Sequence, residues 1–206
     1  MRIVKTAIVA LAMLGTATSS AGATTIAEYE ESFARYTKGT QDFCKEILKN
    51  PTQQEFNSCY GSSVFDVTIK KEDGKFKSFY AIAVALDEYK TNGEIALGIV
   101  CTGPSDVGVY VMMQNTQPSA EARMSDKTIW AIRKGDAPRR EFFEPLMAGK
   151  TTGVRGEKAT ELLDYLAKGD EAPILVEMMT DQVYLGEYKI SNLGDTIKAA
   201  TDLCKL

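Results

Sequence analysis

The stretch "FKSFYAIAVALDEYKTNGEIALGIVC", residues 76–101, holds two long apolar runs separated by an Asn-Gly pair. Asn-Gly between two apolar runs is typical of a β-hairpin, because both residues tolerate the positive φ that a tight turn requires. The second run ends at Cys101. The sequence therefore predicts two antiparallel strands at the centre of a sheet, with a cysteine at the end of the second strand.

Runs on either side extend this sheet. Residues 64–70 alternate apolar with polar side chains, which is the period of a strand, and "EDGK" then supplies a turn. On the other side, "VYVMMQN" (109–115) completes an antiparallel meander of four strands. The runs "KTIWAIRKG" (127–135) and "RREFFEPL" (139–146) are expected to continue the sheet.

The rest of the chain predicts one helix, two strands and a last helix. Residues 156–170 place their leucines on one face and reach a C-terminal signal at Gly169. "PILVEMM" (173–179) and "VYLGEYKI" (183–190) are strand-like around a short turn.

Ser191 or Asn192 can cap the last helix. Its apolar residues Leu193, Ile197 and Cys204 then fall on one stripe, so Cys204 is expected to face the core.

The N-terminal part is predicted to be a helical hairpin. Apolar residues step at helical spacing from Ile26, "TKGT" (37–40) breaks the pattern, and a second helix ends at Asn50 before Pro51. Thr52 with Glu55 has the spacing of a capping box and can restart a helix through Cys59. We expect residues 24–61 to be an N-terminal helical segment and residues 62–206 to be an α+β domain, a β-meander or sandwich with the last helix packed on the sheet.

Residues 1–23 have the pattern of a secretory signal peptide. Arg2 and Lys5 precede a short apolar stretch, and Ala21-Gly22-Ala23 is a small-residue cleavage site. The apolar stretch is about half the 20 residues that a membrane span needs. We therefore expect cleavage after Ala23, no membrane span thereafter, and a periplasmic or secreted protein.

Export changes the meaning of the four cysteines, because an oxidising compartment forms disulfides. A zinc site is disfavoured, since the chain has no CxxC pair and no histidine. Of the three connectivities we prefer Cys44 with Cys59, local across the helical hairpin, and Cys101 with Cys204, which would anchor the last helix on a strand. The other two connectivities remain open.

The residue types exclude several kinds of chemistry. The absence of histidine excludes Ser-His-Asp and Cys-His mechanisms. "GKTT" (149–152) resembles the end of a phosphate-binding loop, but Glu144 stands where that loop needs a glycine. Carboxylate pairs such as Asp87 with Glu88, or Glu141 with Glu144, lie beside polar turns where solvated charges are ordinary. The sequence thus predicts no catalytic residue, no cofactor and no metal.

Charge and aromatic residues bear on the partner. A net charge of −4 gives no general attraction for nucleic acid or anionic membranes. The single tryptophan stands among basic residues, which together form a candidate surface for an acidic partner or an anionic glycan of the cell envelope: Trp130, Arg133, Lys134, Arg139 and Arg140. The alternative, which we favour, is that the tryptophan fills the core while the basic residues solvate a turn.

Four segments together resemble a family of exported proteins of Gram-negative bacteria: "CKEILKNPTQQEFNSCY" (44–60), "IALGIVCTG" (95–103), "TIWAIRKGDAPRREFF" (128–143) and "YLGEYKISNLGDTIKAATDLC" (184–204). The layout is similar to that of type VI secretion-associated accessory proteins of the VasI kind and, more loosely, to invasion-associated locus B proteins. The resemblance implies an exported, non-enzymatic envelope protein and carries over no catalytic residue.

The leading expectation is therefore an accessory or binding module that acts through a protein partner, with its oligomeric state open. An inhibitor of an envelope-directed hydrolase such as lysozyme is the second hypothesis, because an acidic face would attract a basic enzyme. The third is a histidine-free hydrolase of peptidoglycan or polysaccharide.

Overall fold

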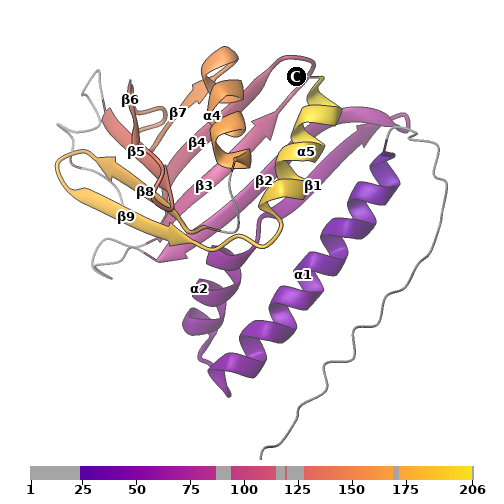
Figure 1. Ribbon diagram of the computed structural model, residues 1–206, viewed down its shortest axis with the longest axis horizontal. Helices are drawn as coiled ribbons and strands as arrows, with labels where there is room; N and C mark the ends of the chain where they lie inside the picture. Colours follow the sequence, from indigo (N-terminus) through magenta and orange to yellow (C-terminus); the bar gives the residue numbers. More distant parts are fainter. Residues whose placement is uncertain (1–23, 87–93, 115–118, 120–127, 169–171, 206) are drawn as a thin grey trace, which may run out of the picture.

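The computed structural model describes residues 24–86, 94–114, 119, 128–168 and 172–205. The predicted signal peptide (1–23) and the Asn-Gly turn of the central hairpin lie outside these residues. Within them the chain forms two antiparallel sheets and four helices (Figure 1). The predicted α+β class, with a helical hairpin at the start and a helix packed on the sheet at the end, is confirmed.

The larger sheet is built around the predicted hairpin. Its five strands are, in spatial order, β1 (Asp66–Glu72), β2 (Lys75–Leu86), β3 (Glu94–Cys101), β4 (Val107–Gln114) and β7 (Thr151–Arg155). The register of β2 on β3 pairs Phe79 with Cys101, so the buried residues of the two strands share one face.

A second sheet corrects the expectation that the later strands continue the first. It contains, in order, β6 (Arg140–Glu144), β5 (Thr128–Lys134), β8 (Ile174–Met179) and β9 (Val183–Tyr188). Besides β3, the strand that pairs with β4 is β7. This strand was not predicted, because its sequence, TTGVR, contains only one large apolar residue. Gly153 is needed there: a Cβ at this position would lie 2.6 Å from Cδ1 of Tyr110, whose ring rests on the outer face of the sheet.

The core lies between the inner face of the larger sheet and the elements that cover it. The second sheet, α4 (Glu157–Ala167) and α5 (Leu193–Cys204) all cover this face. Leu97, Ile99 and Val109 are fully buried in it. Each such side chain contributes about 1.5 to 3 kcal/mol of transfer free energy, so this layer dominates the stability of the fold.

The first helix corrects the predicted break at residues 37–40, because α1 runs without interruption over Ile26–Leu48. A Thr25–Glu28 capping box starts it, and one stripe that includes Phe33 and Cys44 is buried. A glycine inside a helix costs about 1 kcal/mol relative to alanine. Gly39 therefore weakens α1 without ending it, since the buried stripe holds the helix on both sides of position 39.

The second helix, α2 (Gln53–Ser63), begins as predicted. The Thr52–Glu55 capping box is present, and Lys49 and Asn50 turn the chain through positive φ angles of 46° and 75°. Asn192 begins α5, but its side chain does not cap the helix as expected. Its amide instead accepts from the backbone nitrogen of Phe65 at 2.8 Å and donates to the Phe65 carbonyl at 2.9 Å.

Two disulfides tie the helices to the rest of the chain. Cys44 bonds to Cys59 between α1 and α2, and Cys101 bonds to Cys204 between β3 and α5. These are the pairs preferred from the sequence, and Cys204 is fully buried, as its stripe predicts. Disulfides of this kind are typical of proteins outside the reducing cytoplasm. None of the helices that the structure describes is long and apolar enough to span a bilayer.

The two bonds are expected to differ in their contribution to stability. They close loops with sequence separations of 103 and 15 residues. In the chain-entropy model, replacing Cys101 and Cys204 together by alanine lowers the free energy of unfolding by about 4 to 5 kcal/mol, and replacing Cys44 and Cys59 lowers it by about 3. Urea denaturation of both double variants measures this. An equal or larger loss for the Cys44 and Cys59 variant would show that loop length does not set the order.

Candidate functional site

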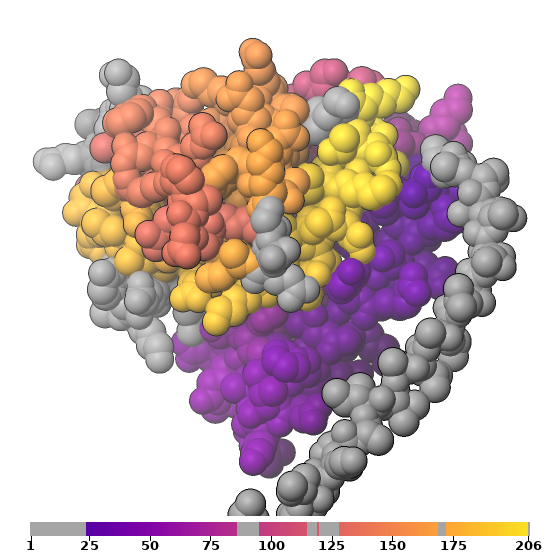
Figure 2. Space-filling model, viewed as in Figure 1, coloured from indigo at the N-terminus to yellow at the C-terminus, as the bar shows by residue number. Residues whose placement is uncertain are grey.

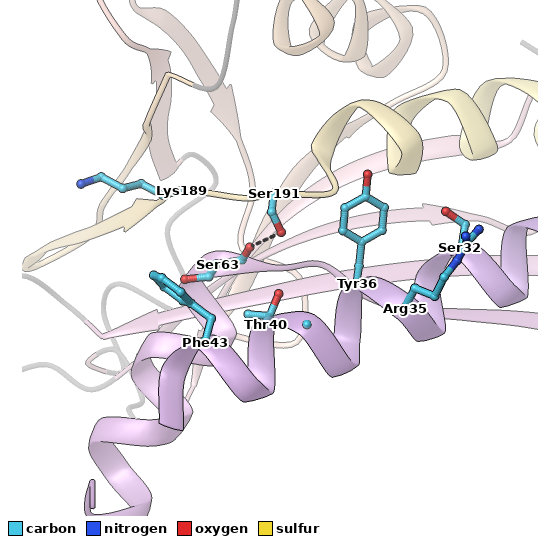
Figure 3. A pocket seen from close by; sticks show the side chains of 9 residues that line it. Ser32, Arg35, Tyr36, Thr40, Phe43, Ser63, Lys189 and Ser191 are labelled. Carbon is cyan, nitrogen blue, oxygen red and sulfur yellow. Dashed lines mark hydrogen bonds between the residues drawn. The ribbon is translucent and has the colours of Figure 1, made fainter. Parts of the chain in front are cut away.

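A groove of about 830 Å³ runs between α1 and the connection from β9 to α5 (Figure 3). Six of its lining residues come from α1: Ser32, Arg35, Tyr36, Gly39, Thr40 and Phe43. Ser63, at the end of α2, and Lys189 and Ser191, in the β9–α5 connection, form the opposite side. The groove thus brings together three parts of the chain that are distant in sequence.

Helical spacing explains the wall made by α1. Residues three and four apart share a helix face, and Tyr29, Phe33 and Cys44 turn one such face into the core. The adjacent stripe borders the groove and leaves Phe43 53% exposed. One turn further on, Ile47 is 50% exposed. In the space-filling view, α1 (indigo) lies on the flank of the molecule beside α5 (yellow) (Figure 2).

Hydrogen bonds fix the opposite wall. The backbone nitrogen of Lys189 donates to the Ser62 carbonyl at 2.8 Å, and that of Ser191 donates to the Ser63 carbonyl at 2.9 Å. The Ser191 hydroxyl donates to the same Ser63 carbonyl at 3.1 Å (Figure 3). These three hydrogen bonds join the β9–α5 connection to the end of α2, outside both sheets.

A polar clamp holds the N-terminal half of α1 on α5. The hydroxyl of Tyr29 donates to Asp202, and the Nζ of Lys198 donates to Asp202 at 2.6 Å and to the Tyr29 hydroxyl at 2.9 Å. The hydrogen bonds from Lys198 and then from Tyr29 lower the pKa of Asp202. The clamp at one end and the Cys44–Cys59 disulfide at the other fix the wall of the groove.

The two cationic side chains that line the groove differ in their contacts with acidic residues. Lys189 is 3.8 Å from Glu187, a loose and exposed contact. Arg35 is exposed and forms no ion pair with any residue that the structure describes. An aromatic side chain and a free guanidinium at one concave surface can bind by apolar contact and by hydrogen bonding.

The carboxylates considered from the sequence do not converge here. Glu141 pairs with Arg139, and Glu144 pairs with Lys158 at 2.7 Å. Residues 87 and 88 lie outside the described part of the chain. Among the residues that are described, no group of three or more acidic or cysteine side chains could hold a metal ion.

The structure corrects the candidate surface around Trp130. This side chain is fully buried and its ring stacks on Phe142 with 4.4 Å between centroids, so it cannot contact a partner. Lys134 is also buried, and its Nζ donates to the Leu166 carbonyl at 2.6 Å. The structure thus shows the alternative, in which the tryptophan fills the core.

The three arginines of that candidate surface are exposed but do not act together. Arg139 pairs with Glu177 at 2.6 Å on the outer face of the second sheet, the face that also carries Arg133. Arg140, on the opposite face of the sheet, lies 5.4 Å from the ring centroid of Tyr165. They therefore do not form a single basic surface.

Sequence reasoning missed the groove because the predicted break at residues 37–40 hid the stripe that lines it. When residues 26–48 are taken as one continuous helix, the stripe that lines the groove can be seen in the sequence. Tyr36, Phe43 and Ile47 recur at helical spacing beside the buried stripe, which widens the apolar face beyond what the core covers.

Comparisons with known proteins add no assignment for this groove. No family model matches the chain, and no curated protein or solved structure matches it.

The clamp predicts a pH-dependent contribution to stability. Because the folded-state pKa of Asp202 lies below its unfolded value of about 3.9, its contribution is full above about pH 4 and is lost as the pH falls through the folded value. Asp202→Asn is expected to lower the free energy of unfolding by about 1 kcal/mol or less at pH 7, with the difference from wild type vanishing in acid.

Denaturation at a series of pH values measures this difference. Asp164→Asn is the control, because Asp164 is an exposed carboxylate on α4 without an ion pair among the described residues. A loss for Asp202→Asn that is the same at pH 7 and in acid would contradict the clamp.

Proposed function

We propose that the protein is an exported, non-enzymatic binding module of the cell envelope, periplasmic or secreted, that docks a protein in the groove beside α1. The observation that carries the proposal is Phe43. It is a large aromatic side chain, 53% exposed, in a concave site whose α1 wall also carries the guanidinium of Arg35 about two helical turns away (Figure 3). Arg35 forms no ion pair with any residue that the structure describes. Aromatic and arginine side chains dominate the energy of protein interfaces.

The rigidity of the groove supports this function. Its α1 wall is fixed by the disulfide and the Tyr29 clamp, and its other wall by the hydrogen bonds of Lys189 and Ser191. A preformed site loses little conformational entropy on binding, which leaves more of the contact energy as affinity.

The exported location is supported by three observations of different kinds. Two disulfides fit an oxidising compartment. The pattern of residues 1–23 is that of a signal peptide, and the layout of the cysteines resembles that of exported accessory proteins.

Two exposed phenylalanines allow a matched test. Phe43 lies at the groove and Phe143, 57% exposed, lies on β6. Tagged protein is cross-linked in its native cell envelope and the captured protein is identified by mass spectrometry. We expect Phe43→Asp to reduce its recovery at least about tenfold, as loss of a binding hot spot does, whereas Phe143→Asp does not.

The identity of the captured protein refines the function. A lytic enzyme would make the protein an inhibitor, and a secretion component would make it an accessory protein. Equal recovery with both variants, or recovery of glycan fragments without a protein, would overturn docking in the groove.

A further inference from the structure

We propose that the groove beside α1 receives α1 of a second copy of this chain, in antiparallel orientation, with a two-fold axis beside Gly39. This inference rests on the proposed function, because it names the protein that the groove binds. Each copy would complete the groove of the other with its own Phe43.

Gly39 is the first observation. It stands in the middle of a continuous helix, is exposed and lines the groove, and a Cβ built on it would meet nothing within 4 Å. The folded chain therefore has no need of a glycine at this position. A second helix crossing here would need one, because small residues let helix axes approach closely.

The charges along α1 are the second observation. Arg35, Asp42 and Glu46 are exposed and lie on the same side of the helix as Gly39, at spacings of minus four, plus three and plus seven. None of them forms an ion pair within the described residues. On this side of α1 the cation of Arg35 lies one turn before the glycine, and the anions of Asp42 and Glu46 lie about one and two turns after it.

In an antiparallel pair the cation of each copy lies near the anions of the other copy, so the favourable charge contact forms twice. With the axis beside Gly39, the residue four positions before it on one copy faces the residue four positions after it on the other. Arg35 then faces Phe43 of the second copy and lies next to its Asp42, with Glu46 one turn further. A parallel pair would instead set Arg35 against Arg35 and Asp42 against Asp42, so the charges select the antiparallel orientation.

The exposed apolar residues are the third observation. Phe43 borders the groove, and Ile47, also half exposed, follows it by one turn on the same face. In the antiparallel pair each Phe43 enters the other copy's groove between Arg35 and Tyr36, which buries both aromatic rings. A partner helix that carried charges of only one sign could pair with Arg35 or with the two anions, but not with both.

Charge exchange tests this arrangement. Sedimentation equilibrium of the oxidised chain over a wide range of concentration is expected to show a monomer–dimer equilibrium. Arg35→Glu and Asp42→Arg, each alone, place like charges in contact twice per dimer and should weaken it at least about tenfold. An equimolar mixture of the two variants restores both contacts, so it should dimerise as wild type does.

The control for charge is Lys38→Glu, which makes the same change of charge as Arg35→Glu on a part of α1 that faces β1 rather than the groove. It should leave the dimer unchanged. A mixture of Arg35→Glu and Asp42→Arg that stays monomeric would overturn the antiparallel pairing.

Gly39→Ala separates docking from folding. The added methyl group favours the helix, so the urea midpoint should rise, yet it blocks the helix contact, so dimerisation should weaken. Gly194→Ala, at a second helical glycine with open space around it, should raise the midpoint without affecting the dimer. Unchanged dimerisation of Gly39→Ala would remove Gly39 from the interface.

Failure of self-docking can be distinguished from failure of the proposed function. A chain that is monomeric at all concentrations, while Phe43-dependent capture still finds a different protein, overturns self-docking and leaves the proposed function standing. A monomeric chain without Phe43-dependent capture overturns both.

Discussion

Burial of the inner face of the β2–β3 hairpin is the constraint on which the rest of the structure depends. Phe79, Leu97 and Ile99 are fully buried on this face, and a single sheet cannot remove them from water. The second sheet, α4 and α5 supply the cover. The Cys101–Cys204 bond ties α5, the last of these elements, to β3.

That arrangement leaves α1 at the margin of the core. Its buried stripe covers the β1 edge and contacts α5 through Tyr29, but the helix is long enough to extend beyond them to Cys44. The side of α1 that borders the β9–α5 connection is only partly covered by described residues, and it leaves Phe43 53% exposed at the groove. The Tyr29 clamp ties the N-terminal half of α1 to α5, and the Cys44–Cys59 bond ties its C-terminal part to α2.

Local signals made much of this predictable from the sequence. The hairpin, the Thr52–Glu55 capping box and the core-facing stripe of α5 each rest on neighbouring residues, and each is found in the structure. The assignment of strands to two sheets could not be derived, because it depends on which faces meet across the core. The predicted break at Gly39 was wrong for a physical reason: glycine lowers helix propensity by an amount that tertiary burial of Phe33 and Cys44 outweighs.

Three features of α1 beside the groove do not help the chain to fold, and together they distinguish the groove from a simple defect in packing. The first is a mid-helix glycine with empty space around it, and the second is the exposure of the apolar side chains of Phe43 and Ile47. The third is that Arg35 and Asp42 form no ion pair with any residue that the structure describes. Sequences that fold well are locally consistent, and they depart from that consistency mainly at functional sites. Scattered over the surface, such features would need no explanation. Gathered along α1, which a polar clamp holds at one end and a disulfide at the other, they support the proposal that this surface receives another helix.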